Sequence, residues 1–303
     1  MTADPTRRGR LTAVTDADRP RLIAHRGFAG CFPENTLTAV RAAAATPETD
    51  GIEIDVVPTR DDRLVVFHDD DLSRLTDAPA SVATHAGWEL PYAELSTHSV
   101  VGTDQPIALL ADVLDALPPA LPVNIECKHP GREPFGFDEP LSGTERSIAT
   151  DRWRGFIGRV LDAATAVDNP VVLSSFYEGA LAATRELDAS MPLAVVFSNA
   201  IGTGLELADR YDTEAIHLRW NMVDGDPYFS RSVPDAGPFA SVGLIERAHA
   251  EERAVNVWTV RTWREAIGLA RAGVDGLIAD YPGVVSIFSS PNGGSDLPET
   301  ENH

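Results

Sequence analysis

Six charged or titratable residues fall within short apolar segments of the kind that form buried strands: His25, Glu53, Asp55, His68, Glu126 and Lys128. A buried charge costs free energy unless it is paired or serves a site. Each residue alone has a plainer explanation. A strand carboxylate is usually half of a structural ion pair, and a histidine at a strand end is usually hydrogen-bonded. The occurrence of all six in one chain favours a functional site.

Three of the six are carboxylates whose spacing brings them together. In GIEIDVV, residues 51–57, Glu53 and Asp55 share one face because side chains alternate along a strand with a period of two. Glu126 and Lys128 share one face of NIECK in the same way. Converging carboxylates raise one another's pKa values unless a cation lies among them, so we expect a bound metal ion. Oxygen-only ligands favour Mg²⁺ or Ca²⁺ over zinc.

The two histidines are not needed as ligands of such an ion. His25 ends the apolar segment RLIAH, and His68 ends LVVFH. Because imidazole changes its charge near neutral pH, both are candidates for general acid–base catalysis.

Lys128 is the only lysine among 303 residues. Chance retention is one explanation. The other is that this position requires a compact ammonium on a flexible stem, because a planar guanidinium demands more width and bidentate geometry.

Alternating strand-like and helix-like segments indicate βαβ units around a parallel sheet. The predicted strands are residues 21–25, 51–57, 64–68, 121–127, 170–175, 192–198, 215–220, 254–260 and 276–280. The predicted helices are residues 34–45, 108–116, 145–167, 178–189, 204–211, 241–253 and 262–272. About eight such units suit a single closed (β/α)₈ TIM barrel with parallel strands, in which active sites lie at the C-terminal strand ends. All six polar residues are expected there.

The domain prediction is a disordered lead-in over 1–19, one barrel over 20–288 and a disordered tail over 289–303. Residues 69–107 form a long connection without clear periodicity, and such connections are often functional. The first residues contain no apolar core of a secretory signal, and no stretch approaches the ~18 apolar residues of a membrane span. We therefore expect a cytoplasmic protein in which Cys31 and Cys127 are free thiols, the alternative being one disulfide.

The formal net charge of −21 disfavours nucleic acid and anionic lipid as partners. Acidic excess with a single lysine indicates adaptation to high salt, where screening weakens self-repulsion. An acidic, GC-rich lineage is the alternative source of this composition.

Several other residues carry weaker patterns. Pro33, Glu34, Asn35 and Thr36 suit a helix start, where capping and a contact role are both open. The run 69–71, three aspartates, is expected to be a solvated loop. Four histidines have no supporting pattern and receive no role: His85, His98, His129 and His217. Trp258 could be a core residue or a pocket wall.

The motifs, taken together, resemble the glycerophosphodiester phosphodiesterase family over roughly residues 20–285. The motifs that carry the resemblance, in chain order, are AHRGFAGCFPENT, GIEIDVVPTRDDRLVVFHDD, NIECK, LSSF, VWTV and ADYP. Family members are metal-dependent enzymes on a TIM barrel, so the resemblance implies that fold and a divalent cation.

The resemblance also implies roles for individual residues. His25 and His68 would be the acid–base pair, and Glu53, Asp55 and Glu126 would hold the ion. Arg26 and Lys128 would contact the phosphate, and Phe176 and Trp258 would line the pocket. In the chemistry proposed for the family, the metal activates the glycerol 2-hydroxyl for attack on phosphorus. One histidine assists, the other protonates the leaving alcohol, and water then opens the cyclic phosphate.

The sequence departs from the family pattern in three places. Arg261 follows VWTV where asparagine is common, Ala279 replaces a threonine, and the segment 129–150 is long. These departures concern the substrate head group. The expected partner is a small glycerophosphodiester. The alternatives are a lysophospholipase D or sphingomyelinase-D-like activity on the same scaffold, and a non-catalytic phosphate-binding protein.

Overall fold

The computed structural model describes residues 19–132, 134, 136, 140–224 and 243–289. The two segments predicted to be disordered, 1–19 and 289–303, lie outside these residues except for Arg19 and Ser289. Among the helices described, none combines the length and hydropathy needed to cross a membrane.

Eight parallel strands close into a barrel, as the sequence predicts. They are β1 (Arg21–His25), β2 (Gly51–Pro58), β4 (Val123–Cys127), β5 (Val171–Ser175), β6 (Leu193–Phe197), β7 (Ala215–Arg219), β8 (Ala254–Val260) and β9 (Gly276–Ala279). The ring closes because β1 pairs with both β2 and β9. All carboxyl ends of these strands therefore face one mouth.

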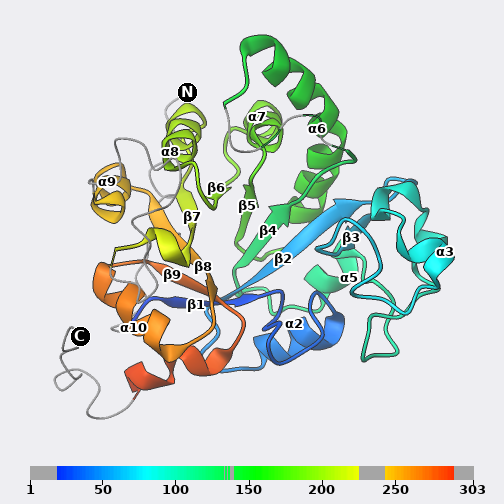
Figure 1. Cartoon of the computed structure of the whole chain (residues 1–303), viewed down its shortest axis with the longest axis horizontal. Helices are drawn as coiled ribbons and strands as arrows, with labels where there is room; N and C mark the ends of the chain where they lie inside the picture. The colour runs from blue at the N-terminus through cyan, green and yellow to red at the C-terminus, as the bar shows by residue number, and fades with distance from the viewer. Residues whose placement is uncertain (1–18, 133, 135, 137–139, 225–242, 290–303) are drawn as a thin grey trace.

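Helices surround the strands (Figure 1). They are α2 (Leu37–Ala44), α5 (Leu110–Asp115), α6 (Gly143–Thr165), α7 (Glu178–Leu187), α8 (Ile201–Arg210), α9 (Leu244–Ala250) and α10 (Trp263–Ala272), with short 3₁₀ turns η2 (Trp220–Met222) and η4 (Pro282–Ser289). The helix predicted at 241–253 is described from residue 243 onward.

Capping side chains set several helix starts. Thr36 accepts a hydrogen bond from the Ala39 amide, so the helix predicted from residue 34 begins at Leu37. Ser142 and Glu145 form a capping box, which starts α6 two residues earlier than predicted.

The strand predicted at 64–68 is the main correction to the predicted fold. It is β3 (Leu64–Val66), and it pairs antiparallel with β2 in the register Val56↔Val66. The turn from Pro58 to Leu64 is too short for the crossover that a parallel strand needs, so the chain forms a hairpin. His68 is therefore not at the end of a barrel strand. The hairpin brings it back to the level of Asp55, whose carbonyl accepts a hydrogen bond from the Phe67 amide.

The connection 69–107 contains short helices and an apolar cluster of its own. The helices are α3 (Ala80–Ala83), η1 (Gly87–Glu89) and α4 (Tyr92–Leu95). The buried cluster consists of Val57, Val65, Phe67, Leu72, Leu90, Leu95, Val100 and Ile107. This part projects from the side of the barrel beside β3 (Figure 1). Because the cluster includes residues of β2 and β3, it anchors the loop that follows His68.

Glu178, at the start of α7, is a buried carboxylate that ties three elements together. It accepts hydrogen bonds from the Leu141 amide at 2.7 Å, Arg146 Nε at 2.7 Å, Arg210 Nη1 at 2.6 Å and the Tyr211 hydroxyl at 2.8 Å. Burial would raise the pKa of Glu178, but these donors outweigh burial and hold the pKa below its ordinary value.

We expect Glu178→Gln to lower the free energy of unfolding by about 2–4 kcal/mol at neutral pH, because a buried ion network loses its central charge. A depressed folded-state pKa gives stability that is present above the unfolded value of about 4.3 and is lost as the pH falls through the folded value. Urea unfolding should therefore show a difference between wild type and variant that shrinks below about pH 4.

Glu186→Gln is the matched control, because Glu186 pairs with Arg154 on the exposed surface. It should change stability by less than about 0.5 kcal/mol. A Glu178→Gln effect that did not depend on pH would contradict the electrostatic explanation.

Candidate active site

A left-handed turn after β1 directs Arg26 toward β2. Arg26, Gly27 and Phe28 have φ of +52°, +76° and +65°. Glycine is required at 27, because a Cβ there would lie 2.7 Å from the Ala39 backbone carbon of α2. The Arg26 amide then donates to Glu53 Oε2 at 3.0 Å.

The three carboxylates predicted as ligands do converge. Glu53, Asp55 and Glu126 each offer an oxygen atom within 4.8 Å of the others. The register between β2 and β4 accounts for this, since Asp55 lies opposite Glu126. Burial, together with the charges of Asp55 and Glu126, raises the pKa of Glu53 well above its ordinary value.

Two fixed cations border the carboxylates. Arg26 Nε lies 3.1 Å from Asp55 Oδ2, and Lys128 Nζ lies 2.7 Å from Glu126 Oε1 and 3.5 Å from Asp55 Oδ1. Burial would raise the pKa of Asp55, but Arg26 and Lys128 outweigh it and hold this pKa well below its usual range. The prediction that Glu126 and Lys128 share a face is confirmed.

The donor set fits a divalent cation. Three carboxylates against two fixed cations leave one excess negative charge, and the buried Glu53 Oε1 has no hydrogen-bond partner in the described part of the chain. All candidate ligand atoms are oxygens, which suits a hard ion. A second group, Glu34, His68 and Asp69, is also close enough for a metal, but Arg74 already pairs with both of its carboxylates.

Each of the two histidines contacts an aspartate. His25 Nδ1 lies 2.6 Å from Asp280 Oδ1, and His68 Nδ1 lies 2.7 Å from Asp69 Oδ1. His25 Nε2 is 3.9 Å from Glu53 Oε2. Burial lowers the pKa of His68. The charge of Asp55 raises this pKa and the charge of Lys128 lowers it, and the net result is a pKa below the ordinary value.

The loop before α2 has contact roles as well as capping. The Asn35 amide donates to Asp55 Oδ2 at 2.9 Å, with Asn35 at φ +60°. Glu34 accepts hydrogen bonds from Arg26 at 2.8 Å and from Arg74 at 2.9 and 3.0 Å. Thr36 caps the helix. The sequence left capping and a contact role open for this loop: Thr36 has the capping role, and Glu34 and Asn35 have contact roles.

The sequence reasoning missed Asp69, Asp280 and Arg74. The prediction that residues 69–71 are merely a solvated loop is wrong for Asp69, which pairs with His68 and Arg74. Asp280 follows the last barrel strand directly, as His25 ends the first, and that shared position at strand ends was the available signal.

Two adjoining cavities meet at this site. The inner cavity, of about 180 Å³, is lined by His25, Arg26, Glu53, His217 and Trp258 among others. The outer cavity, of about 560 Å³, is lined by Asp69, Asp70, Asp71, His129 and Tyr177 among others. His68, Glu126, Lys128 and Phe176 line both.

Aromatic side chains form part of the inner cavity. Phe176 and Trp258 pack edge to face with ring centroids 5.6 Å apart, so Trp258 is a cavity wall as well as a packing residue. His217, to which no role was assigned, is buried, and burial lowers its pKa to about 3. A neutral imidazole there offers hydrogen bonding without charge.

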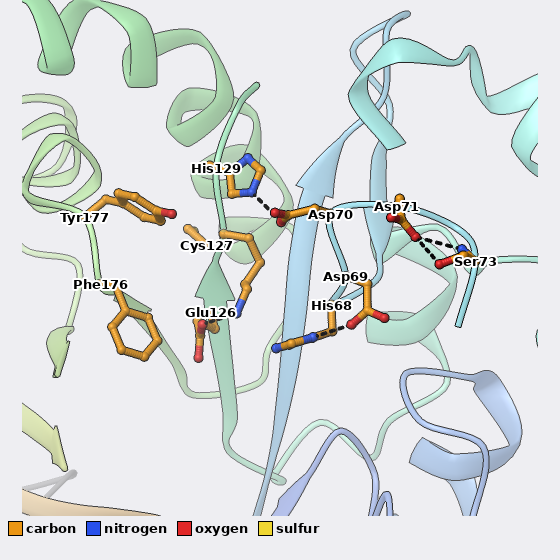
Figure 2. A pocket seen from close by; sticks show the side chains of 11 residues that line it. His68, Asp69, Asp70, Asp71, Ser73, Glu126, Cys127, His129, Phe176 and Tyr177 are labelled. Carbon is orange, nitrogen blue, oxygen red and sulfur yellow. Dashed lines mark hydrogen bonds and ion pairs between the residues drawn. The ribbon is translucent and has the colours of Figure 1, made fainter. Parts of the chain in front are cut away.

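The outer cavity has an aromatic side and an acidic side. Phe176 and Tyr177 lie opposite His68 and the three aspartates, with Glu126 between the two sides (Figure 2). His129, another residue without an assigned role, is buried, and its Nε2 lies 2.9 Å from Asp70 Oδ1. This contact joins the segment after β4 to the segment after β3. A ligand in this cavity therefore meets aromatic rings on one side and acidic side chains on the other.

The sequence model that describes the glycerophosphoryl diester phosphodiesterase family matches residues 25–284 of this chain. The chain belongs to this family. It is accordingly a phosphoric diester hydrolase.

Two of the similar proteins align with most of this glycerophosphoryl diester phosphodiesterase family member, and a third aligns with 36% of it. A glycerophosphodiester phosphodiesterase of Bacillus altitudinis is 28% identical over 265 residues, covering 86% of this chain and 95% of the relative. A phosphodiesterase of Oleispira antarctica, solved with the product sn-glycerol-3-phosphate, superposes with a TM-score of 0.67 at 22% identity, covering 89% and 97%. A lysophospholipase D of Rattus norvegicus is 37% identical over 120 residues, or 36% of each chain.

Proposed function

We propose that the enzyme hydrolyses glycerophosphodiesters to a glycerol phosphate and an alcohol, with a divalent cation and two histidines. The supporting observation is one barrel mouth that holds the three carboxylates, two fixed cations and both histidines between two cavities. A phosphodiester brings one negative charge, and the family to which the chain belongs acts on this bond type.

In this proposal Glu53, Asp55 and Glu126 hold Mg²⁺ or Ca²⁺. The ion would supply positive charge that stabilises the charge developing on the phosphoryl oxygens. Arg26 and Lys128 bind the remaining phosphate oxygens. Both cations are held in place before substrate binds, so little reorganisation is needed when the charge develops.

The cavities suggest which proton each histidine transfers. His25 lines the inner cavity, whereas His68 lines both. With the glycerol in the smaller inner cavity, His25 takes the proton of the 2-hydroxyl as that oxygen forms its bond to phosphorus. His68 gives a proton to the alcohol oxygen as its bond to phosphorus breaks. Water then opens the cyclic phosphate with the two roles reversed, as microscopic reversibility requires.

A lysophospholipase D activity is the second candidate, and the rat relative favours it over part of the chain. One side of the outer cavity argues against it, because His68 and three aspartates line that side of the space where an acyl chain would have to begin. A non-catalytic phosphate-binding protein would need none of the paired histidine geometry seen here. We therefore propose a polar leaving alcohol.

The experiment that tests this function is a substrate panel assayed with and without divalent metal. Glycerophosphocholine, glycerophosphoethanolamine and glycerophosphoglycerol should release glycerol phosphate, and a lysophospholipid should react far more slowly. Preference for the lysophospholipid would favour the second candidate. Binding of glycerol phosphate without turnover of any diester would favour the third.

The predicted location and salt preference also remain proposals. Cys31 and Cys127 are both free, as predicted, with Cys31 exposed and Cys127 buried, which supports a reducing compartment such as the cytoplasm. The net charge of −21 supports function at high salt.

Substitution of the single lysine should impair catalysis without unfolding the chain. Lys128→Met is expected to lose about 2–4 kcal/mol of transition-state stabilisation, comparable with loss of one oxyanion donor. Lys128→Arg should fold and bind metal yet be strongly impaired, because Nζ lies between Glu126 and Asp55, where a planar guanidinium has little room.

Steady-state kinetics would measure both variants, with Arg154→Lys on the exposed surface as the matched control. If Lys128→Arg kept the wild-type kcat/KM, retention of lysine at this position would be a matter of chance.

A further inference from the structure

Three neighbouring strands place an arginine, an aspartate and a histidine in a row at the barrel mouth. Ala279 of β9 lies opposite Ala24 of β1 and opposite Val260 of β8. The residues that come next in the chain are His25, which ends β1, Asp280, directly after β9, and Arg261, directly after β8. Asp280 Oδ1 contacts His25 Nδ1 at 2.6 Å, and Asp280 Oδ2 accepts from Arg261 Nε at 2.7 Å.

The second histidine has the same arrangement, built from a different part of the chain. Asp69 Oδ1 contacts His68 Nδ1 at 2.7 Å, and Asp69 Oδ2 accepts from Arg74 Nε at 2.6 Å. Arg74 Nη2 also donates to Asp69 Oδ1 at 2.6 Å, so this aspartate is held at both oxygens by its arginine. Here all three residues come from one loop after β3. In both sets the aspartate lies between the Nδ1 atom of a histidine and the Nε atom of an arginine.

Other histidine–aspartate pairs in the described part of the chain differ. His129 meets Asp70, and His249 meets Asp275, in each case through Nε2. Contact with an aspartate through Nδ1 is thus a shared feature of the two histidines proposed to move protons, and both residues line a cavity.

We propose that Asp280 with Arg261, and Asp69 with Arg74, are positioning residues that hold His25 and His68 with Nδ1 protonated and Nε2 directed at the substrate. This inference rests on the proposed acid–base function of the two histidines.

The physical reason lies in the two nitrogens of imidazole. In the neutral ring one nitrogen carries the proton and the other accepts, and the partner of one nitrogen determines which. A carboxylate at Nδ1 requires the proton there, so Nε2 presents its lone pair to a substrate hydroxyl. When Nε2 gains a proton, the same carboxylate stabilises the imidazolium.

The arginine has a separate task. It engages the second carboxylate oxygen, which limits rotation of the aspartate and keeps it ionised. In agreement, the pKa values of Asp280 and Asp69 lie below their ordinary range: burial would raise them, but the hydrogen bonds from histidine and arginine outweigh it.

The test combines kinetics with a spectroscopic readout of the tautomer. Asp280→Asn and Asp69→Asn keep the side-chain shape and remove the charge. Each should lower kcat by about 10²–10⁴-fold with KM changed far less, as expected when the ring is held in the wrong tautomer. The Asp69→Asn loss should shrink with a p-nitrophenyl leaving group, which needs no proton, whereas the Asp280→Asn loss should not.

Imidazole ¹⁵N spectra at about pH 8, above the usual histidine pKa, report the tautomer directly. Wild type should show His25 and His68 protonated on Nδ1, assigned by the signals that vanish in His25→Gln and His68→Gln. Asp280→Asn should move the proton of His25 alone, and Asp69→Asn that of His68 alone. This readout does not depend on turnover, so failure of the proposed function and failure of this inference are distinguishable.

Arg74→Leu and Arg261→Leu supply variants that should fold, because both side chains are at least half exposed. Each should lower kcat roughly 10-fold, the size of effect typical of outer hydrogen-bond partners. Asp209→Asn, which removes a surface aspartate paired with Arg247 and Arg253, is the control and should keep wild-type kcat. Wild-type spectra with either ring protonated on Nε2, or aspartate variants with unchanged kcat, would overturn the proposal.

Discussion

Excess chelator is expected to abolish hydrolysis, and Mg²⁺ or Ca²⁺ should restore it better than Zn²⁺. The three candidate ligands offer only carboxylate oxygens, which hard cations prefer. Calorimetric titration of metal into chelator-treated protein, alongside the activity assay, would measure both binding and restoration. Full activity in excess chelator would refute the assignment.

Glu53→Gln sharpens this prediction, because it removes one charge without changing shape. Metal affinity should fall, and the metal should no longer raise the melting temperature as it does in wild type. Without metal, however, the variant should be at least as stable as wild type. Burial and two neighbouring carboxylates already disfavour the charged form of Glu53. Glu186→Gln, on the exposed surface, should change neither property.

Replacement of either histidine is the second large expected effect. His25→Ala and His68→Ala should each lower kcat by about 10²–10⁴-fold, the range of general acid–base catalysis. Metal should still bind in both variants, because the carboxylates alone hold it. Substrate hydrolysis and metal titration on the same preparations would check both statements.

The two variants should differ in their response to the leaving group. His68 lines the outer cavity proposed for the alcohol, so His68→Ala should recover most with a good leaving group such as p-nitrophenol. His249→Ala is the control, since His249 pairs with Asp275 away from the two cavities. Equal losses for every substrate would contradict the division of roles, and loss of metal in a folded variant would make that histidine a ligand.

The barrel could be predicted because its determinants are local. Apolar runs alternating with amphipathic segments indicated βα units, and the predicted strands at 21–25 and 254–260 match β1 and β8. The two-residue period of a strand likewise predicted that Glu53 and Asp55 share a face, and that Glu126 and Lys128 do. Such a pattern survives folding because the geometry of one strand fixes it, whatever packs around it.

Long-range pairing decided the rest. His68 reaches the site through a hairpin rather than a barrel strand, which depends on how β3 pairs with β2. Asp69 looked like one of three solvated aspartates, and its contact with His68 depends on the loop that the apolar cluster of 57–107 holds in place.

The sequence by itself therefore determined which side chains each barrel strand presents, and that those at the carboxyl ends of the parallel strands gather at one barrel mouth. Only the tertiary structure decided which of them touch. His25 and Asp280 are 255 residues apart in the sequence, and they meet because closure of the barrel pairs the first strand with the last in one register. A shift of one residue in that register would turn each side chain to the other face of the sheet, so the contact depends on packing of the whole ring.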